Sequence, residues 1–306
     1  MSAADGSDPV AGIVAELRRL MPGMPDEDGP RFAAAVTVPG PYAPGQDALQ
    51  RDDVPRGHLL ERRFVSGTIY PGVERTARIY IPPASESGRP LSLMVFQDGA
   101  RYLGPEANAA VVFDNLIAAG DMPPTVGLFV EPGERGPGLP VYGGSGNRSV
   151  EYDSLGDAYA RFLIEELIPE LTRGLAVAGA PANRAIVGLS SGGICAFNAA
   201  WERPDYFGKV VSHCGSFVNI RGGHLLAAEV RRAPRKPLRV FLQTGLHDLD
   251  ILFGAWAIAN RELASALAYR AYDHQLVVGE GGHSLTHGGA LLPDTLRWLW
   301  RDWRTA

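Results

Sequence analysis

Short apolar runs alternate with longer amphipathic segments from about residue 90 to the carboxyl end of the chain. The apolar runs span 91–96, 125–130, 184–189, 209–214, 238–244 and 272–278. The segments with helical spacing of apolar residues span 107–119, 156–171, 193–202, 224–232, 256–269 and 291–303. This alternation is typical of a mostly parallel sheet with helices on both faces. We therefore predict an α/β fold.

An antiparallel hairpin is expected ahead of the first parallel strand. Residues 61–69 and 74–81 alternate apolar and polar side chains on either side of the turn Tyr70-Pro71-Gly72-Val73. Two such runs joined by a short turn predict paired antiparallel strands. We expect this hairpin to form the edge of the sheet.

The first fifty residues differ from the rest of the chain. They contain one short amphipathic segment, from Val10 to Leu20, among clusters of Pro, Gly and Asp. We expect residues 1–50 to be an extension that packs on a main domain formed by residues 51–306. The beginning of the chain lacks a basic segment followed by an apolar one, and no stretch approaches about 18 continuous apolar residues. These features predict a cytoplasmic protein.

Composition narrows the classes of partner. With 45% apolar residues, disorder is excluded, and the 37 Gly and 24 Pro show no collagen-like period. The formal charge of −5 argues against a nucleic acid or an anionic membrane surface as the main partner. A small-molecule substrate fits best, and a homo-oligomer stays open. Cys195 and Cys214 are too few for a disulfide scaffold, and no C-x-x-C zinc motif occurs, so we expect buried free thiols and no metal site.

A candidate nucleophile lies between a predicted strand and a predicted helix. The pentapeptide Gly188-Leu189-Ser190-Ser191-Gly192 matches G-x-S-x-G directly after the run 184–189. A serine on such a sharp turn is strained, and the flanking glycines let strand and helix approach closely. The hydroxyl is then exposed at the carboxyl edge of the sheet, where the helix N-terminus favours negative charge. The competing interpretation is an ordinary Gly/Ser turn that caps a helix.

A serine hydroxyl needs a base to become a good nucleophile, and the base needs a carboxylate that fixes its tautomer. In this type of fold the chain order is Ser, then Asp or Glu, then His. His283 follows the last apolar run in the glycine-rich segment 279–283, and we predict it as the base. His287 also follows the last apolar run. We expect it to lie at the surface or to face the substrate instead of acting as the base. For the acid, both Asp248 and Asp250 follow the run 238–244; we favour Asp248 and expect the other carboxylate to cap the loop.

Two backbone N–H groups are needed to bind a developing oxyanion. We predict that Ser191 supplies one of them, since it follows the candidate nucleophile. The second is expected from Gly99 or Ala100, in the turn after the run 91–96. Asp98 in the same turn is expected to be structural, because a free carboxylate aimed at an oxyanion would oppose catalysis.

The Gly- and Pro-rich stretch 131–149 is too long for a simple connection, so we interpret it as a functional loop. Arg148, Glu151 and Tyr152 follow it as candidate substrate-binding residues. Two interpretations compete: Arg148 and Glu151 form a buried ion pair that shapes the pocket, which we favour, or they bind polar groups of the substrate. The tryptophans of the last helix are expected to be core residues, because they recur at helical spacing.

Five ordered motifs resemble the enterochelin-esterase-like (esterase D) branch of the α/β hydrolases. They read VFQDGARY, NRSVEYDSLGDAYARFLIEELIPEL, GLSSGG, TGLHDLD and GEGGHSLTHGGALLPDTLRWLW. The resemblance extends from about residue 55 to the carboxyl end and implies an α/β-hydrolase fold. It also implies Ser190 as the nucleophile, Asp248 as the acid and His283 as the base. Feruloyl and other carbohydrate esterases belong to the same branch, as do the mycolyltransferases.

The sequence thus predicts a serine hydrolase that cleaves a carboxylic ester or lactone through an acyl-enzyme, without a metal or organic cofactor. The resemblance suggests a siderophore-type trilactone or an aryl ester of a sugar as the substrate. Transfer of the acyl group to an alcohol instead of water is one alternative. A non-catalytic binding module on the same fold is the other.

Overall fold

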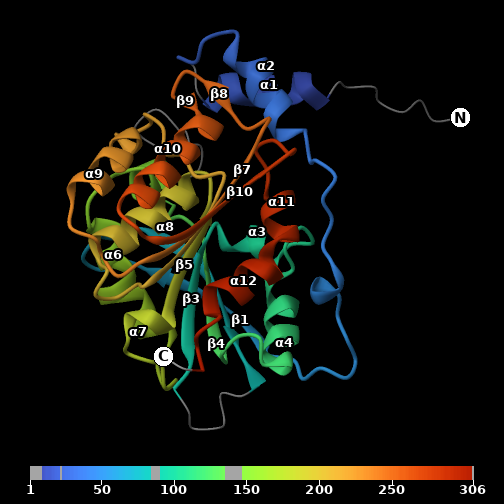
Figure 1. Ribbon diagram of the computed structural model, residues 1–306, viewed down its shortest axis with the longest axis vertical. Helices are drawn as coiled ribbons and strands as arrows, with labels where there is room; N and C mark the ends of the chain where they lie inside the picture. Colours follow the sequence, from blue (N-terminus) through green and yellow to red (C-terminus); the bar gives the residue numbers. More distant parts are fainter. Residues whose placement is uncertain (1–8, 21–22, 84–89, 135–146, 305–306) are drawn as a thin grey trace, which may run out of the picture.

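The predicted apolar runs form the centre of an eight-stranded sheet (Figure 1). The structure is a computed structural model, which describes residues 9–20, 23–83, 90–134 and 147–304. The strand order is β1-β2-β4-β3-β5-β6-β7-β10. The strands span His58–Val65 (β1), Glu74–Ile81 (β2), Ser92–Gln97 (β3), Thr125–Val130 (β4), Arg184–Leu189 (β5), Lys209–His213 (β6), Arg239–Gly245 (β7) and Asp273–Gly279 (β10). Each predicted strand is present.

The hairpin of β1 and β2 is antiparallel and lies at one edge of the sheet, as predicted. Its register pairs His58 with Ile81 and Val65 with Glu74. Strand β2 also runs antiparallel to β4, whereas β3 to β10 pair in parallel. The mostly parallel sheet confirms the α/β class.

Helices cover both faces of the sheet (Figure 1). One face is covered by α3, α4, α11 and α12, and the other by the segments from α6 to α10. The main helices span Ala109–Ala119 (α4), Ala158–Arg161 (α6), Ile168–Leu171 (α7), Ser191–Glu202 (α8), Leu226–Arg232 (α9), Trp256–Tyr269 (α10) and Leu292–Trp300 (α12), with a π-helical segment over Phe162–Leu167. The predicted helices are all present. Short helices that were not predicted span Asp28–Val36 (α2), Gly99–Leu103 (α3), Asn147–Tyr152 (α5) and Leu285–Ala290 (α11).

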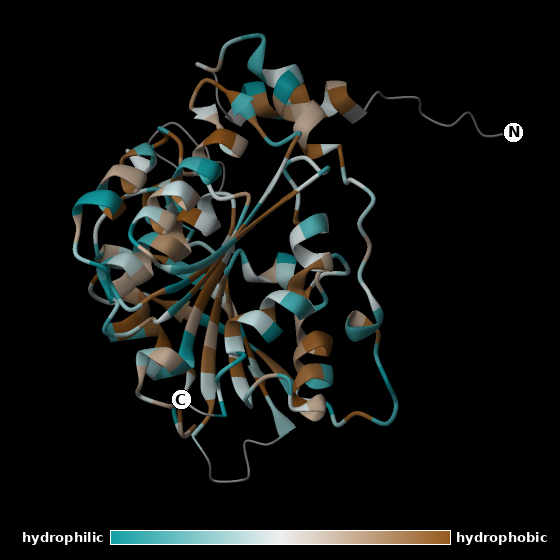
Figure 2. Cartoon of the chain, viewed as in Figure 1, coloured by the Kyte–Doolittle hydropathy of each residue, from teal (hydrophilic) through white to brown (hydrophobic). Residues whose placement is uncertain are grey.

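The core consists of two apolar layers that share the strands. Successive strand residues point to opposite faces, so Val95 belongs to one layer and Phe96 to the other. Brown, hydrophobic stretches accordingly predominate along the central strands (Figure 2). Trp300 is fully buried in the layer beneath α12, and Cys195 and Cys214 are buried free thiols, as predicted.

The amino-terminal helices lie at the carboxyl end of the sheet (Figure 1). Helix α1 spans Pro9–Leu20, and α2 packs against the small hairpin of β8 (Asp250–Ile251) and β9 (Gly254–Ala255). Ala35 of α2 joins a small cluster of buried apolar residues, formed with Val218, Leu249, Ile251 and Trp256. The boundary at residue 50 stays a prediction.

The long loop is shorter than expected at its carboxyl end. Residues 135–146 lie outside the described ranges, and the last residues of the predicted loop, from Asn147, already belong to α5. None of the helices in the described ranges combines the length and the apolar character needed to cross a membrane.

Candidate active site

Ser190 lies on a sharp turn between β5 and α8. Its backbone has φ 59° and ψ −123°, an uncommon conformation for a residue with a side chain. A Cβ at Gly188 would lie 2.0 Å from the carbonyl oxygen of Gly192, so only glycine allows strand and helix to approach this closely. The turn places Ser190 at the carboxyl end of β5.

The structure brings together Ser190, His283 and Asp248, although Ser190 and His283 are 93 positions apart in the chain. The Nε2 atom of His283 lies 2.8 Å from the Ser190 Oγ atom. Its Nδ1 atom lies 2.6 Å from Oδ1 of Asp248. The three residues follow the carboxyl ends of three parallel strands, β5, β7 and β10, which all meet at one edge of the sheet. A serine, an imidazole and a carboxylate are thus joined in one hydrogen-bonded series.

The Asp248 carboxylate is held in one orientation. It accepts hydrogen bonds from the Thr244 hydroxyl (2.7 Å) and the Leu249 N–H (2.8 Å). Burial favours the neutral acid, but the charge of His283 and these hydrogen bonds outweigh burial and lower the pKa of Asp248. Asp250 is exposed and lies in β8. The carboxylate favoured from the sequence is therefore the one that contacts His283.

Ser216 is a contact of the nucleophile candidate that sequence reasoning missed. Its hydroxyl lies 3.3 Å from the Ser190 hydroxyl and accepts a hydrogen bond from Nε1 of Trp256 (3.0 Å). The Trp256 ring also packs edge-on against the His283 ring, with the ring centroids 5.9 Å apart. No sequence motif marks Ser216, because its role depends on where the turn after β6 lies.

Ser191 and Gly99 each begin a helix, α8 and α3 respectively. The N–H groups of a first helical turn have no acceptor within the helix, so they are available to an anion. A Cβ at Gly99 would lie 2.3 Å from the backbone of Phe129, so a side chain is excluded there by the close approach of β4.

Ala100 does not fit its predicted place. Its N–H donates a hydrogen bond to Oε1 of Glu131 (2.6 Å), so this group is already satisfied. Burial raises the pKa of the Glu131 carboxyl, and the hydrogen bond from Ala100 opposes that effect. Of the two candidates for the second oxyanion-binding N–H, Gly99 therefore remains.

The expected ion pair between Arg148 and Glu151 is wrong. Arg148 instead forms a bidentate pair with Asp98, at 2.9 and 2.6 Å, and both side chains line the cavity described below. Residues 148 and 151 are three positions apart in α5, a spacing at which helical side chains can meet. Each is instead paired with a residue outside α5, Arg148 with Asp98 and Glu151 with Arg75. The Arg148 guanidinium thus balances the charge of the Asp98 carboxylate, which fits the structural role expected for Asp98.

Glu151 is fully buried and pairs with Arg75 of β2, at 2.7 and 3.0 Å. It does not line the cavity. Tyr152 is buried as well: its hydroxyl accepts a hydrogen bond from the Asp98 N–H (3.4 Å), and the Arg148 guanidinium lies above its ring. Both side chains support the wall of the site from behind, which corrects their expected contact with substrate.

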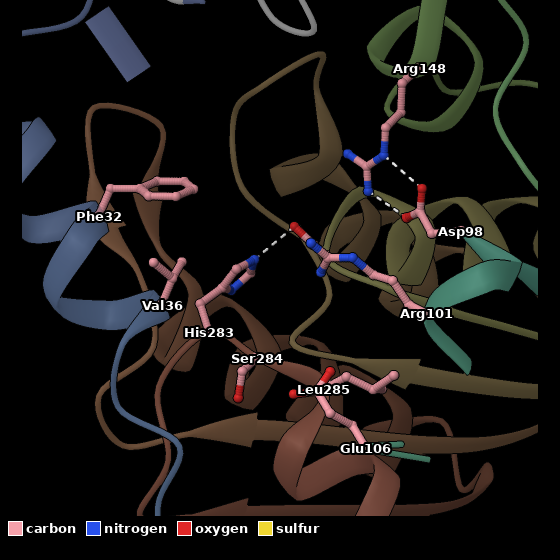
Figure 3. A pocket seen from close by; sticks show the side chains of 10 residues that line it. Phe32, Val36, Asp98, Arg101, Glu106, Arg148, His283, Ser284 and Leu285 are labelled. Carbon is pink, nitrogen blue, oxygen red and sulfur yellow. Dashed lines mark hydrogen bonds and ion pairs between the residues drawn. The ribbon is translucent and has the colours of Figure 1, made fainter. Parts of the chain in front are cut away.

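A cavity of about 640 Å³ opens next to Ser190 and His283. Phe32 and Val36 project toward His283 from α2 on one side, and Arg101 lies with the Arg148–Asp98 pair on the other (Figure 3). Glu106, Ser284 and Leu285 complete the lining. The apolar side of the cavity thus comes from the amino-terminal segment, which no motif had indicated.

His287 is neither at the surface nor in the cavity. It is buried, its ring stacks on Tyr42 with centroids 3.8 Å apart, and its Nδ1 atom lies 3.1 Å from the amide nitrogen of Gln243. The expected placement of this histidine is therefore wrong.

Among the residues that the structure describes, one group brings three metal-binding atom types within 4.8 Å: Cys214, Asp248 and His283. Burial raises the pKa of the Cys214 thiol well above its usual range, so the sulfur is protonated. The facing atoms of the other two residues are already hydrogen-bonded to each other. The donor set therefore fits a hydrogen-bonded acid and base better than a metal ion.

The chain matches the model of a known protein family. The model of the family described as "Putative esterase" matches residues 69–299. The Iron(III) enterobactin esterase of Dickeya dadantii (strain 3937) is 26% identical over 243 residues, which are 74% of this chain and 52% of that protein. The chain thus spans about half the length of this curated relative.

Solved structures share the fold. The enterochelin esterase from Shigella flexneri superposes with a TM-score of 0.68 at 21% identity, covering 86% of this chain and 63% of that one. A ferulic acid esterase superposes with a TM-score of 0.63 at 19% identity, covering 80% of this chain and 99% of the other. The fold is therefore that of the α/β hydrolases, as the sequence motifs implied. The chain belongs to the putative esterase family, and its sequence is similar to that of an iron(III) enterobactin esterase.

Proposed function

We propose that the chain is a serine esterase that cleaves a carboxylic ester or lactone through an acyl-enzyme. The observation that carries the proposal is the series Ser190–His283–Asp248, with contacts of 2.8 and 2.6 Å at the carboxyl edge of the sheet. Membership of the esterase family supports the same reaction class.

In the first half of the reaction, the Ser190 oxygen attacks the carbonyl carbon of the substrate while His283 accepts the hydroxyl proton at Nε2. The Nδ1–H of the ring donates to Asp248, whose ionised carboxylate orients the imidazole and stabilises its charged form. The carbonyl oxygen then carries a negative charge. We propose that the N–H groups of Ser191 and Gly99 bind it; removal of one such donor typically raises the barrier by about 3 kcal/mol.

The tetrahedral intermediate then collapses. The bond to the alcohol breaks, His283 gives its proton to the leaving oxygen, and the acyl group stays on Ser190. In the second half, His283 takes a proton from water while the water oxygen attacks the acyl carbon. The bond from the acyl carbon to Ser190 then breaks as His283 gives that proton to the serine oxygen, which releases the carboxylic acid and restores the free serine and the neutral imidazole. None of these steps requires a cofactor.

For the substrate, we propose a siderophore-type trilactone, on the basis of similarity to the enterobactin esterases. An aryl ester of a sugar is the second candidate, because almost the whole length of a ferulic acid esterase superposes on this chain. Acyl transfer to an alcohol uses the same acyl-enzyme, so product analysis with and without an alcohol acceptor separates it from hydrolysis.

Labelling with a fluorophosphonate probe tests the proposal. The wild-type chain is expected to be labelled and to hydrolyse at least one class in a panel of aryl esters, sugar esters, lactones and catecholate trilactones. Ser190→Ala is expected to abolish both signals. Ser265→Ala is the matched control, because this serine lies on α10 and contacts Arg231 away from the site. A wild-type chain that is neither labelled nor active would favour the binding-module alternative.

A further inference from the structure

The loop that carries His283 is held by backbone contacts to residues 28–42, which we call the strap. Three N–H groups of the loop donate hydrogen bonds to acceptors in the strap. The contacts run from Glu280 to the Tyr42 hydroxyl (2.9 Å), from Gly282 to the Val38 carbonyl (2.8 Å) and from His283 to the Ala35 carbonyl (2.8 Å). The position of the imidazole therefore depends on the strap.

The fit between strap and loop leaves no room for side chains. A Cβ at Gly282 would lie 1.9 Å from the carbonyl oxygen of Ala35. Gly40 has φ +71°, and a Cβ there would lie 3.0 Å from the Gly281 nitrogen. The Tyr42 ring stacks on buried His287, which fixes the hydroxyl that Glu280 contacts. Such close backbone packing restricts the movement of the loop relative to the strap.

The strap also contacts the segment that carries Asp248. Oδ2 of Asp28, a side chain only 3% exposed, accepts a hydrogen bond from the Leu252 N–H (2.7 Å). Ala35 packs in one cluster with Leu249, the residue whose N–H donates to the Asp248 carboxylate. One short segment of chain therefore links the supports of the base and of the acid.

Phe32 and Val36 of the strap form the apolar side of the cavity (Figure 3). The other labelled lining residues include the charged side chains Arg101, Glu106 and the Arg148–Asp98 pair. Of the three apolar residues that line the cavity, Phe32 and Val36 lie on the strap and Leu285 lies in α11. An apolar part of a substrate therefore finds most of its apolar contact on the strap.

We infer that the strap is part of the active site: Asp28 and Tyr42 are positioning residues for the acid and base loops, and Phe32 determines specificity for substrates with a large apolar group. The inference rests on the proposed esterase function. A displacement of about 1 Å in a reacting group can lower a rate about 100-fold, so contacts of this kind affect catalysis without touching the substrate. The predicted boundary at residue 50 then lies within one catalytic unit, because residues on both sides of it form the active site.

Positioning is tested with Asp28→Ala and Tyr42→Phe in the full chain. With a small acetate ester, each variant is expected to lower kcat about 10-fold while KM changes less than about twofold, and the double variant about 100-fold. The rate of fluorophosphonate labelling is expected to fall in parallel. Asp28→Asn keeps an oxygen acceptor for the Leu252 N–H and is expected to recover most of the activity.

Matched controls come from an equivalent contact far from the site. Asp114 accepts hydrogen bonds from the Gly57 N–H (2.8 Å) and the Tyr80 hydroxyl (2.6 Å), so Asp114→Ala and Tyr80→Phe make the same chemical changes there. They are expected to lower the melting temperature as much as the strap variants but to keep kcat. Equal kcat losses in both sets would contradict a positioning role.

The specificity role is tested with Phe32→Ala and Phe32→Leu. The alanine variant is expected to lower the ratio of kcat/KM for a bulky aryl ester to kcat/KM for the small acetate ester about 10-fold, and leucine is expected to restore part of that ratio. Equal effects on both esters would overturn this part of the inference. A wild-type chain that is not labelled contradicts the esterase proposal and the strap's role together, whereas a labelled wild type with fully active strap variants contradicts the inference alone.

Discussion

Asp248 and Asp250 are two residues apart, yet their carboxylates lie in different surroundings. Asp248 is buried and contacts His283, Thr244 and the Leu249 N–H, whereas the side chain of Asp250 is exposed. Asp250 begins β8, where it is exposed to solvent.

This difference predicts opposite results for the two amides. Asp248→Asn is expected to lower kcat by about 10³- to 10⁴-fold, because an amide no longer favours the productive histidine tautomer or stabilises its charged form. Asp250→Asn is expected to keep activity within about twofold. Steady-state kinetics on an aryl ester distinguishes the two variants, and a comparable loss in both would contradict the assignment of the acid.

At the scale of elements, the segment after β4 depends on one buried ion pair. Glu151 of α5 and Arg75 of β2 have fully buried side chains, and Glu151 also accepts a hydrogen bond from the Gly133 N–H (3.3 Å). The pair thus fixes α5, the helix that carries Arg148, against the sheet.

Glu151→Gln leaves the Arg75 charge buried without a counter-charge. Loss of one member of a buried pair typically costs about 3–5 kcal/mol of the free energy of unfolding, and we expect a loss of that size here. Denaturant unfolding provides the measurement. Glu165→Gln, which removes an exposed pair with Arg161 one helical turn away, is the matched control and is expected to have a much smaller effect. Equal losses of unfolding free energy in the two variants would contradict the claim that the buried pair stabilises the fold more than the exposed one.

The elements that sequence reasoning missed are short. Helices α3, α5 and α11 have five or six residues each, and α2 has nine. Such segments are too short for a periodic apolar pattern, and short helices depend on tertiary packing for their stability. Longer elements such as α8 and α10, with 12 and 14 residues, carry enough of the pattern to be predicted.

At the scale of the whole molecule, the carboxyl end of the chain is tied to the sheet. Arg239, at the start of β7, donates to both carboxylate oxygens of Asp302 (2.9 and 2.7 Å) and to Asp273 (2.7 Å). The hydrogen bonds from Arg239 lower the pKa of Asp302 to about 2, and partial burial opposes this effect. The contact connects the chain after the last helix to β7, next to the edge strand β10.

This pKa predicts how stability depends on pH. Because the folded state holds its carboxylate proton more weakly than the unfolded chain does, the contribution of Asp302 is complete above about pH 4. It is lost as the pH falls toward about 2. Asp302→Asn is expected to lower the free energy of unfolding at pH 7 and to reduce its decline between pH 4 and pH 2. Urea unfolding at several pH values measures this; parallel curves for variant and wild type would contradict it.

The sequence by itself determined the order of strands and helices, the edge hairpin, the turn at Ser190 and the chain order of serine, acid and histidine. These features depend on short-range rules: the apolar period of each element, and the steric freedom of glycine at a tight turn. They are therefore readable within windows of a few residues.

Tertiary structure alone decided which distant groups meet. It paired Arg148 with Asp98 and Glu151 with Arg75, gave the Ala100 N–H to Glu131, and placed Phe32 of the strap in the wall of the cavity. Each contact joins elements far apart in the chain. Hydrogen bonds form only when donor and acceptor come within about 3.5 Å of each other, and the packing of whole elements sets that distance. A pattern within a few neighbouring residues therefore cannot predict which of these distant groups will meet.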